Sequence, residues 1–161
     1  MAEIEDAITK GWAVARREDP QPTVAYFRAL LTSHPDSPQA LFAYASALDY
    51  AGCEGEAALA YEQAFAAGLE GDQLRRGLLQ YGSTLRNLGR VHDAVAALRK
   101  ADDLFPGDAA VKVFLALALT SAKREREAVA NLIVLALDRI PGEELQRYDW
   151  ALRQYAEALG K

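Results

Sequence analysis

Apolar residues recur at helical spacing along almost the whole chain, in segments separated by glycine, proline and short polar stretches. Apolar positions at i, i+3, i+4 and i+7 indicate a helix with one buried face. Alanine and leucine dominate these segments, and both favour helices. The pattern predicts helices at about residues 3–17, 22–33, 38–51, 54–67, 72–88, 91–104, 109–122 and 125–139.

A last amphipathic segment follows at about residues 143–159. Its apolar residues fall on one side of a helix; they are Leu145, Tyr148, Leu152, Tyr155 and Leu159. An array of stacked helices leaves an apolar face open at its end, and a final helix with a polar outer side covers that face. We therefore expect residues 143–159 to form a capping helix.

The predicted helices form pairs that share one arrangement of small and large residues. In each pair, the first helix carries a large residue followed by a small one, and the second carries an alanine and then a large residue. The copies are Tyr44-Ala45 with Ala57 and Tyr61, Tyr81-Gly82 with Ala94 and Leu98, and Leu115-Ala116 with Ala128 and Leu132. Repetition at a fixed period indicates stacked structural units.

These residues resemble the tetratricopeptide repeat, a helix–turn–helix unit of about 34 residues that reads W-x2-L-G-x2-Y, then A-x3-F, then P. The clearest copy has Leu78, Tyr81, Gly82, Leu85, Ala94, Leu98 and Pro106 at these positions. The second copy has Leu69 in place of the proline, and the fourth has Pro141 one place late. The first copy is degenerate. The whole chain resembles a small free-standing bacterial member of this family.

The resemblance implies an all-α fold, a right-handed α-solenoid of about four tetratricopeptide-like hairpins with a C-terminal capping helix. It implies one domain over residues 1–161, with repeats at about 4–37, 38–71, 75–108 and 109–142. The connection from Ala67 to Leu74 is longer than the repeat requires and carries two glycines. We expect a slightly altered angle between helices there, and no domain boundary.

Single residues carry further expectations about packing and turns. Gly82 leaves room for a neighbouring helix, and Gly52 and Gly89 end first helices in a left-handed conformation that suits glycine. Lys123 occupies the equivalent turn position of the fourth copy, which costs about 1 kcal/mol or forces a different turn. Ser37, Asp36 and Asp108 are candidates to cap the following helices.

The charge and composition narrow the class of partner. A net charge of −5 and a pI near 5.1 argue against nucleic acid, whose binding proteins carry a basic surface. No apolar run approaches the about 20 residues that cross a bilayer, so we expect no membrane partner. The acidic residues 1–6 do not form a signal peptide, and the single cysteine cannot form an internal disulfide. We therefore expect a cytoplasmic protein.

No converging set of catalytic groups is visible in the sequence. His34 and His92 lack a cysteine or acid at ligand spacing, so surface or capping roles fit them better than metal binding. Cys53 has no basic neighbour that would lower its pKa. We therefore predict no enzyme, no cofactor and no metal.

The resemblance implies that a partner lies against the concave face, which the first helix of each repeat lines. The candidate partner-binding residues on that face are Trp12, Phe42, Ser46, Asp49, Arg76, Leu79, Gln80, Ser83, Arg86 and Asn87. The family's carboxylate clamp, which needs Lys and Asn at fixed positions, is absent. The remaining groove, with an apolar floor and a polar rim, suits an apolar or helical segment of an unknown partner protein.

Burial is the alternative interpretation of the apolar members of this set. Phe42 and Leu79 could be covered by packing between repeats. For Val113 and Leu117, on the fourth first helix, we expect the C-terminal helix to cover the side chains.

Trp150 lies on the terminal helix, away from the predicted apolar stripe. An exposed tryptophan is a candidate anchor for a protein contact, and a homodimer is its simplest form; the alternative is a ring partly buried against the fourth repeat. Two functions therefore remain: a module that binds a peptide or helix of a partner in its groove, and a scaffold protein that self-associates through its C-terminal helix.

Overall fold

The computed structural model describes residues 2–161, so Met1, the first residue of the predicted domain, lies outside the described range. The described chain folds into helices alone, apart from one isolated bridge between Arg16 and Asp19. The helices are α1 (Ala2–Ala13), α2 (Gln21–Ser33), α3 (Pro38–Tyr50), α4 (Glu54–Ala66), α5 (Gly71–Asn87), α6 (Val91–Leu104), α7 (Ala109–Ser121), α8 (Glu125–Arg139), α9 (Glu143–Gln146) and α10 (Asp149–Leu159).

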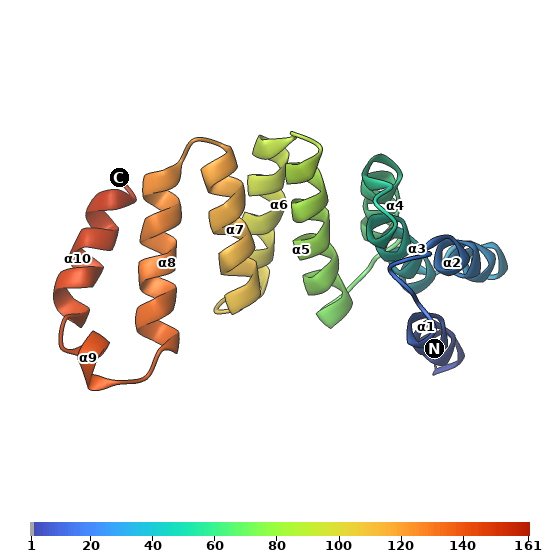
Figure 1. Cartoon of the computed structure of the whole chain (residues 1–161), viewed down its shortest axis with the longest axis horizontal. Helices are drawn as coiled ribbons and strands as arrows, with labels where there is room; N and C mark the ends of the chain where they lie inside the picture. The colour runs from blue at the N-terminus through green and yellow to red at the C-terminus, as the bar shows by residue number, and fades with distance from the viewer. Residues whose placement is uncertain (1) are drawn as a thin grey trace.

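Consecutive helices pack in pairs, and the pairs follow one another from one end of the molecule to the other (Figure 1). The contacts within α3–α4, α5–α6 and α7–α8 form hairpins, and α2–α3, α4–α5 and α6–α7 join each hairpin to the next. The two termini lie at opposite ends of the array. This arrangement confirms the predicted all-α solenoid.

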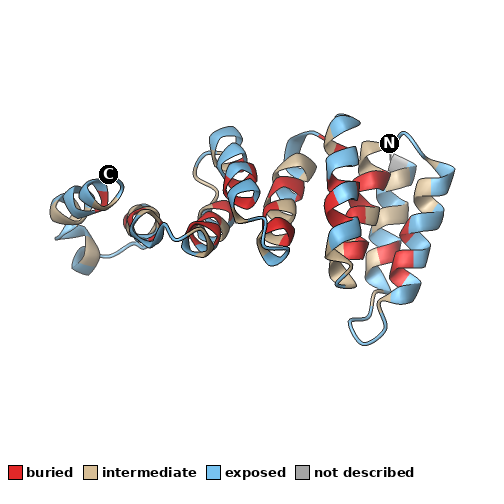
Figure 2. Cartoon of the chain, turned by 90° about the horizontal axis from the view of Figure 1, so that it is seen from above, coloured by how far each residue is buried: buried red, intermediate tan, exposed pale blue. Residues whose placement is uncertain are grey.

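Small residues allow the helices to approach closely, and large residues fill the space beside them. A Cβ atom added at Gly82 would lie 2.5 Å from Cγ of Leu98, so α5 and α6 pack as tightly as the sequence predicts. Ala57 and Ala94 are fully buried, and Tyr61 is the largest fully buried side chain. Figure 2 shows the buried residues concentrated on the facing sides of the helices.

Two hydrogen-bonded caps begin first helices of the array. The Ser37 side chain accepts a hydrogen bond from the backbone N–H of Ala40, and Asp108 accepts one from that of Val111. Asp36, the third candidate, is exposed and lies outside both caps. The Val111 N–H, together with the guanidinium of Arg75, holds the pKa of Asp108 below its usual range.

The turns within hairpins use left-handed residues, as predicted. Gly52 and Gly89 have φ angles of 76° and 77°. Lys123 has a φ of 62°, the same conformation, so the fourth hairpin keeps the turn with a lysine where a glycine would be easier.

The connection between α4 and α5 changes the direction of the array more than the slight change that we expected. In Figure 1, α1–α4 are seen nearly end-on while α5–α8 lie in the plane, and Figure 2 shows α1–α4 from the side. Gly68 and Gly71 take φ angles of 89° and 60°, which redirect the chain over a few residues. Leu69 between them is buried in the core, with Phe65 and Leu74 against it, so the two directions share packed side chains.

The first predicted helix is shorter than its expected range of 3–17, because α1 ends at Ala13. Val14 is 72% exposed and has no core to pack against, and the charged residues 16–19 precede Pro20. The backbone N–H of Ala15 bonds to the carbonyl of Trp12, which closes a tight turn at the helix end.

The predicted terminal helix is interrupted, since α9 ends at Gln146 and α10 begins at Asp149. The Gln146 side-chain amide donates to the carbonyl of Leu137, which ties α9 to the end of α8. Residues 147 and 148 then turn the chain so that α10 packs against α8.

Candidate functional site

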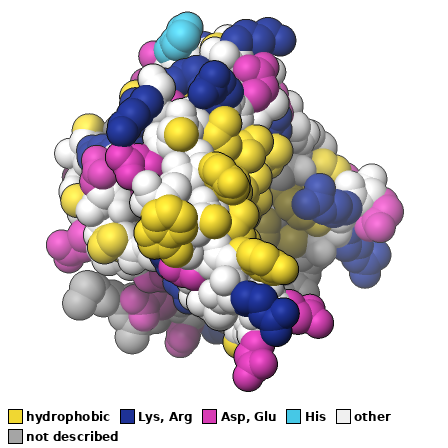
Figure 3. All heavy atoms as spheres, turned by 90° about the vertical axis from the view of Figure 1, so that its left-hand side faces the viewer, with side chains coloured by type: hydrophobic (Ala, Val, Ile, Leu, Met, Phe, Trp, Pro, Cys, Tyr) yellow, Lys and Arg dark blue, Asp and Glu magenta, His cyan; other side chains and the backbone are white. Residues whose placement is uncertain are grey.

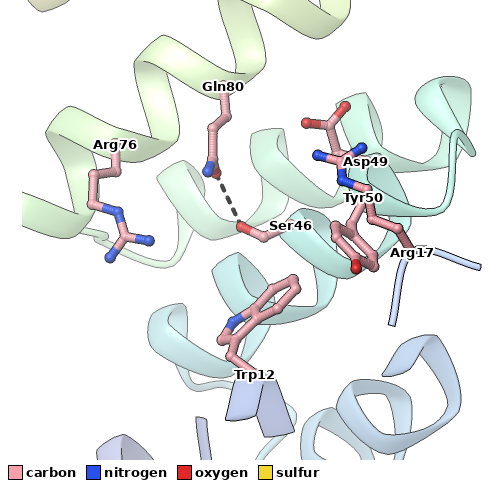
Figure 4. A pocket seen from close by; sticks show the side chains of 7 residues that line it. All are labelled: Trp12, Arg17, Ser46, Asp49, Tyr50, Arg76 and Gln80. Carbon is pink, nitrogen blue, oxygen red and sulfur yellow. Dashed lines mark hydrogen bonds between the residues drawn. The ribbon is translucent and has the colours of Figure 1, made fainter. Parts of the chain in front are cut away.

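A pocket of about 410 Å³ opens between α1, α3 and α5 (Figure 4). It is lined by Trp12, Arg17, Ser46, Asp49, Tyr50, Arg76 and Gln80. A second pocket of about 350 Å³ is lined by Ile8, Thr9, Trp12, Phe42, Ala43, Ser46, Gln73 and Arg76. Because the two pockets share Trp12, Ser46 and Arg76, they form one continuous depression, the α1–α3–α5 groove.

A hydrogen-bonded cluster forms the floor of this groove. The hydroxyl groups of Ser46 and Tyr61 both donate to Oε1 of Gln80, at 3.0 and 3.1 Å. Tyr61 is fully buried beneath the groove, and burial raises the pKa of its phenol well above the usual range, so it remains a donor. The side-chain amide of Gln80 therefore has a fixed orientation, with its oxygen committed to the floor.

The aromatic wall of the groove is held by ring contacts. The centroid of the Trp12 ring lies 5.0 Å from that of Phe27 and 5.7 Å from that of Tyr50, the latter in an edge-on arrangement. Such contacts add to the stabilisation from area burial. Trp12 is thus half-buried and fixed in position, with part of its ring facing the groove.

Two arginines flank the groove, and each lies over an aromatic ring. The guanidinium carbon of Arg17 is 5.0 Å from the centroid of the Tyr50 ring, and that of Arg76 is 5.7 Å from the centroid of the Phe42 ring. These cation–π contacts hold two long side chains beside the pocket. In Figure 4, Arg76 and Arg17 lie on opposite sides of the hydrogen bond between Ser46 and Gln80.

Asp49 contributes the carboxylate of the pocket. Its Oδ1 accepts a hydrogen bond of 2.9 Å from the hydroxyl of Thr84, which is fully buried on α5. Burial raises the pKa of Asp49, and the Thr84 hydroxyl partly opposes that change. The carboxylate is therefore held toward α5 rather than extended into solvent.

The structure brings together six of the candidate partner-binding residues at this groove: Trp12, Phe42, Ser46, Asp49, Arg76 and Gln80. Phe42 is only 5% exposed, and its ring lies 6.3 Å from Tyr61 in the core. Its contribution to the groove is therefore a narrow part of the wall and a platform for Arg76.

The other four candidates lie along the same helix but outside the residues that line the groove. Leu79 is half-buried against the core cluster of Leu78, Ala101 and Val111, as the alternative interpretation holds. Asn87 donates to Glu54 of α4 at 2.8 Å and accepts from Arg86 at 3.2 Å, so the Asn87 side chain faces α4. The Nε atom of Arg86 is buried without a hydrogen-bond partner among residues 2–161. Ser83 is half-buried.

Arg17, Thr9 and Gln73 line the groove but were not among the candidate residues. Arg17 was missed because we expected it within a helix over 3–17. Instead α1 ends at Ala13, and the chain after it places Arg17 over the ring of Tyr50. The signal in the sequence was the charged run at residues 16–19, which has no apolar residue to continue the buried face of the helix.

The C-terminal end presents a second, different surface. Trp150, Tyr148 and Tyr155 are 77%, 60% and 63% exposed. Figure 3, which views this end, shows hydrophobic side chains in a band across it. The predicted stripe is therefore only partly correct, because Tyr148 and Tyr155 face outward.

The packing of α10 explains this difference. Its buried residue is Ala156, and Leu152 and Leu159 on either side are half-buried. Arg153 also pairs with Asp138 of α8 at 2.9 Å, beside this apolar contact. The aromatic side chains are left beside the contact with α8, not within it.

The C-terminal helix does not cover α7, contrary to our expectation. Val113 and Leu117 both remain exposed. The physical reason is that α10 packs on α8, the second helix of its hairpin. The face of α7 that carries Val113 and Leu117 is thus left open.

Within residues 2–161, no group of three or more His, Cys, Asp or Glu side chains is placed to hold a metal ion. His34 contacts the carbonyl of Leu30 through Nδ1 at 3.2 Å, at the end of α2. Cys53 is a free, half-buried thiol. No helix in the described part of the chain is long and apolar enough to cross a membrane.

Three solved structures share the fold. YrrB, described as a TPR protein with an unusual peptide-binding site, has a TM-score of 0.64 and 18% identity, over 87% of this chain and 74% of YrrB. The MamA RS-1 ArsTM double mutant has a TM-score of 0.68 and 14% identity, over 98% and 89% of the two chains. PilF of Pseudomonas aeruginosa has a TM-score of 0.70 and 21% identity, over 98% of this chain and 76% of PilF.

A search of curated protein sequences finds no match to the chain. The sequence profile of one family, described as Tetratrico peptide repeat, matches residues 38–159. The matched region begins with α3 and contains the three hairpins whose small and large residues repeat, and it covers well over half of the chain. On these grounds the chain belongs to the tetratricopeptide repeat family.

Proposed function

We propose that this chain is a protein-interaction module that binds a peptide or helix of a partner protein in the α1–α3–α5 groove. The observation that carries the proposal is the pair of connected pockets, about 410 and 350 Å³, formed by three successive first helices. Sites of this size, with aromatic walls and a few fixed polar groups, are typical of ligand binding.

Several side chains that line the groove are also held in one conformation without a ligand. Trp12 is held by Phe27 and Tyr50, and Gln80 is held by Ser46 and Tyr61. Side chains that are already ordered lose little conformational entropy on binding, which favours affinity. The similar fold of YrrB, a protein described as having a peptide-binding site, adds support for a peptide as the ligand here.

Blocking the groove at an exposed position tests this proposal without disturbing the core. Thr9 is exposed on α1, lines the second pocket, and donates to the carbonyl of Glu5 at 2.9 Å. The variant Thr9→Trp places a large ring at the groove. Thr32→Trp is the matched control, because Thr32 is also exposed on a helix and donates to the carbonyl of Arg28 at 2.9 Å.

The measurement is selection of random peptides on the immobilised wild-type chain, followed by fluorescence anisotropy with each enriched peptide. We expect the enriched peptides to bind wild type and Thr32→Trp alike and to lose binding to Thr9→Trp. Circular dichroism checks that both variants keep their helices. Peptides that bind all three proteins equally would place the interaction outside the groove.

A second function, self-association, is favoured by the aromatic residues at the C-terminal end. Trp150, Tyr148 and Tyr155 expose three large rings within one helix region, and tryptophan and tyrosine are the side chains that most often anchor protein interfaces. We propose a homodimer through α10 as this alternative. Analytical ultracentrifugation should then show a dimer that Trp150→Ala converts to monomer; a monomeric wild type at all concentrations would dispose of it.

A further inference from the structure

The α1–α3–α5 groove presents more hydrogen-bond donors than acceptors. Oε1 of Gln80 accepts both hydroxyl groups of the floor, so the Nε2 hydrogens of Gln80 remain to face the pocket. In Figure 4, the indole N–H of Trp12 forms no hydrogen bond with the other residues that line the pocket. Arg17 and Arg76 supply further donors at the two sides. A ligand that satisfies this set must be rich in acceptors.

Arg17 and Arg76 have no carboxylate partner within residues 2–161, and of the arginines without one they are the two that line the groove. The other arginines without an ion pair are Arg16, Arg28, Arg86, Arg126, Arg139 and Arg147. The ion pairs within residues 2–161 engage Arg75, Arg90, Arg99, Arg124 and Arg153 with nearby carboxylates. Arg17 and Arg76 belong to none of them and lie instead on Tyr50 and Phe42. A guanidinium held on a ring keeps its outer N–H groups available for a carboxylate.

Asp49 offsets only part of this positive charge, because the pocket holds two arginines and one carboxylate. Its Oδ1 is engaged by the buried hydroxyl of Thr84, which holds the carboxylate on the α5 side of the pocket. Neither arginine forms an ion pair with it. The pocket thus combines two available cations and two neutral donors with one carboxylate that is already hydrogen-bonded.

We infer that the groove binds an acidic segment of a protein partner, in which a carboxylate and an apolar side chain lie next to each other. The carboxylate contacts Arg76 and Nε2 of Gln80, and the apolar side chain lies in the neighbouring pocket against Ile8 and Trp12. This inference rests on the proposed function and adds the chemistry of the ligand.

The net charge of the whole chain restricts where an acidic ligand can bind. With a net charge of −5, the molecule as a whole repels an acidic peptide, so any preference for acidic ligands must come from a local site. Binding through the two arginines is also expected to weaken as salt is added, since partly exposed charges are screened.

Three synthetic peptide libraries test the inference. Each library varies the same apolar positions among Leu, Phe, Trp and Ala, and the polar positions are all Glu, all Gln or all Lys. Binding of each library to the wild-type chain, Thr9→Trp, Arg76→Glu and Lys100→Glu is measured by fluorescence anisotropy. Lys100 is an exposed residue of α6, so Lys100→Glu makes the same change in net charge away from the groove.

We expect wild type and Lys100→Glu to prefer the Glu library, and Arg76→Glu to bind it about tenfold or more weakly. Arg76→Glu should in turn gain affinity for the Lys library. Thr9→Trp should lose binding to the Glu library.

Each other outcome is decisive. If the Glu and Gln libraries bind equally and Thr9→Trp abolishes both, the groove binds peptides but the acidic preference is wrong. If the Glu library binds Thr9→Trp as well as wild type, the preference arises elsewhere on the surface and the inference fails. If no library binds in a way that Thr9→Trp changes, the proposed function itself fails.

Discussion

The two tryptophans of the chain mark two regions that differ in how their aromatic side chains are supported. Trp12 lies in the α1–α3–α5 groove, between Phe27 and Tyr50. Trp150 lies on α10 and is 77% exposed. Both are accessible anchors by residue type, but only Trp12 is held in one position by neighbouring rings.

The same contrast extends to the polar groups around each tryptophan. Beside Trp12, Gln80 is fixed by two hydroxyl groups and two arginines lie over rings. Beside Trp150, Arg153 is already paired with Asp149 and Asp138. Ordered donors without a partner can bind a ligand with little loss of conformational entropy. A surface whose charged groups already form ion pairs offers a ligand mainly apolar area.

The largest expected effect separates the cores beneath the two regions. Tyr61 is fully buried under the groove, and its ring lies 6.2 to 6.5 Å from those of Phe42, Phe65 and Tyr81. We expect Tyr61→Ala to lower the free energy of unfolding by about 3–5 kcal/mol, because it leaves a cavity and removes a donor to Gln80. Trp150→Ala should change it by less than about 0.5 kcal/mol. Urea unfolding measures both; equal losses would show that the C-terminal end is packed as firmly as the groove.

A smaller effect is expected where α5, the back of the groove, meets α6. A methyl group added at Gly82 would lie 2.5 Å from Cγ and 2.9 Å from Cδ1 of Leu98, which is fully buried and cannot move away freely. We expect Gly82→Ala to cost about 1–3 kcal/mol in urea unfolding.

Gly55→Ala is the matched control for that contact. Gly55 lies within α4, and a Cβ atom there would meet no atom within 4 Å. Because alanine favours a helix over glycine, we expect a gain of about 0.5–1 kcal/mol. If Gly82→Ala were also stabilising, the close approach of α5 and α6 would not be needed.

The next effect concerns the cap that joins α5 to α7, between the two regions. Asp108 accepts from the N–H of Val111 at 2.9 Å and pairs with Arg75 of α5 at 2.8 Å. We expect Asp108→Ala to lower the free energy of unfolding by about 1 kcal/mol at pH 7. Asp36→Ala, which removes an exposed aspartate outside any cap, should change it by less than about 0.5 kcal/mol.

The pH dependence of this contribution follows from the direction of the pKa shift. The pKa of Asp108 is lower in the folded chain than the ordinary value of about 3.9 in an unfolded one. Its stabilising effect is therefore complete above that ordinary value and is lost as pH falls through the folded pKa. Urea unfolding at pH 7 and pH 3 should show a smaller difference between wild type and Asp108→Ala at pH 3. A difference that grows in acid would contradict the assignment.

Most of the fold could be predicted from the sequence because its signals are local and repeated. The helical spacing of apolar residues, the left-handed Gly52 and Gly89, and the Ser37 and Asp108 caps each depend on a few neighbouring residues. The repeat then fixes which helices pack together, since each unit buries its apolar face only against the next one.

The candidate site was predicted less completely, because it depends on how distant segments meet. The sequence places Trp12, Ser46, Arg76 and Gln80 on first helices, but the return of Arg17 over Tyr50 requires the end of α1 at Ala13. Similarly, the exposure of Tyr155 depends on which face of α10 packs against α8, and that face carries Ala156. Neither the end of α1 nor the orientation of α10 can be predicted from the spacing of apolar residues.

The smallest expected effect compares the hairpin turns of the two regions. The turn between α5 and α6 has Gly89 at a φ of 77°, and the turn between α7 and α8 has Lys123 at a φ of 62°. A side chain with a Cβ atom is strained in this conformation, so Lys123→Gly should raise the free energy of unfolding by somewhat less than about 1 kcal/mol. The reciprocal change, Gly89→Ala, should lower it by about 1 kcal/mol. Thermal unfolding of the two variants gives the signs directly. If both variants were less stable than wild type, Lys123 would contribute through its side chain, and the C-terminal turn would be specified by more than backbone conformation.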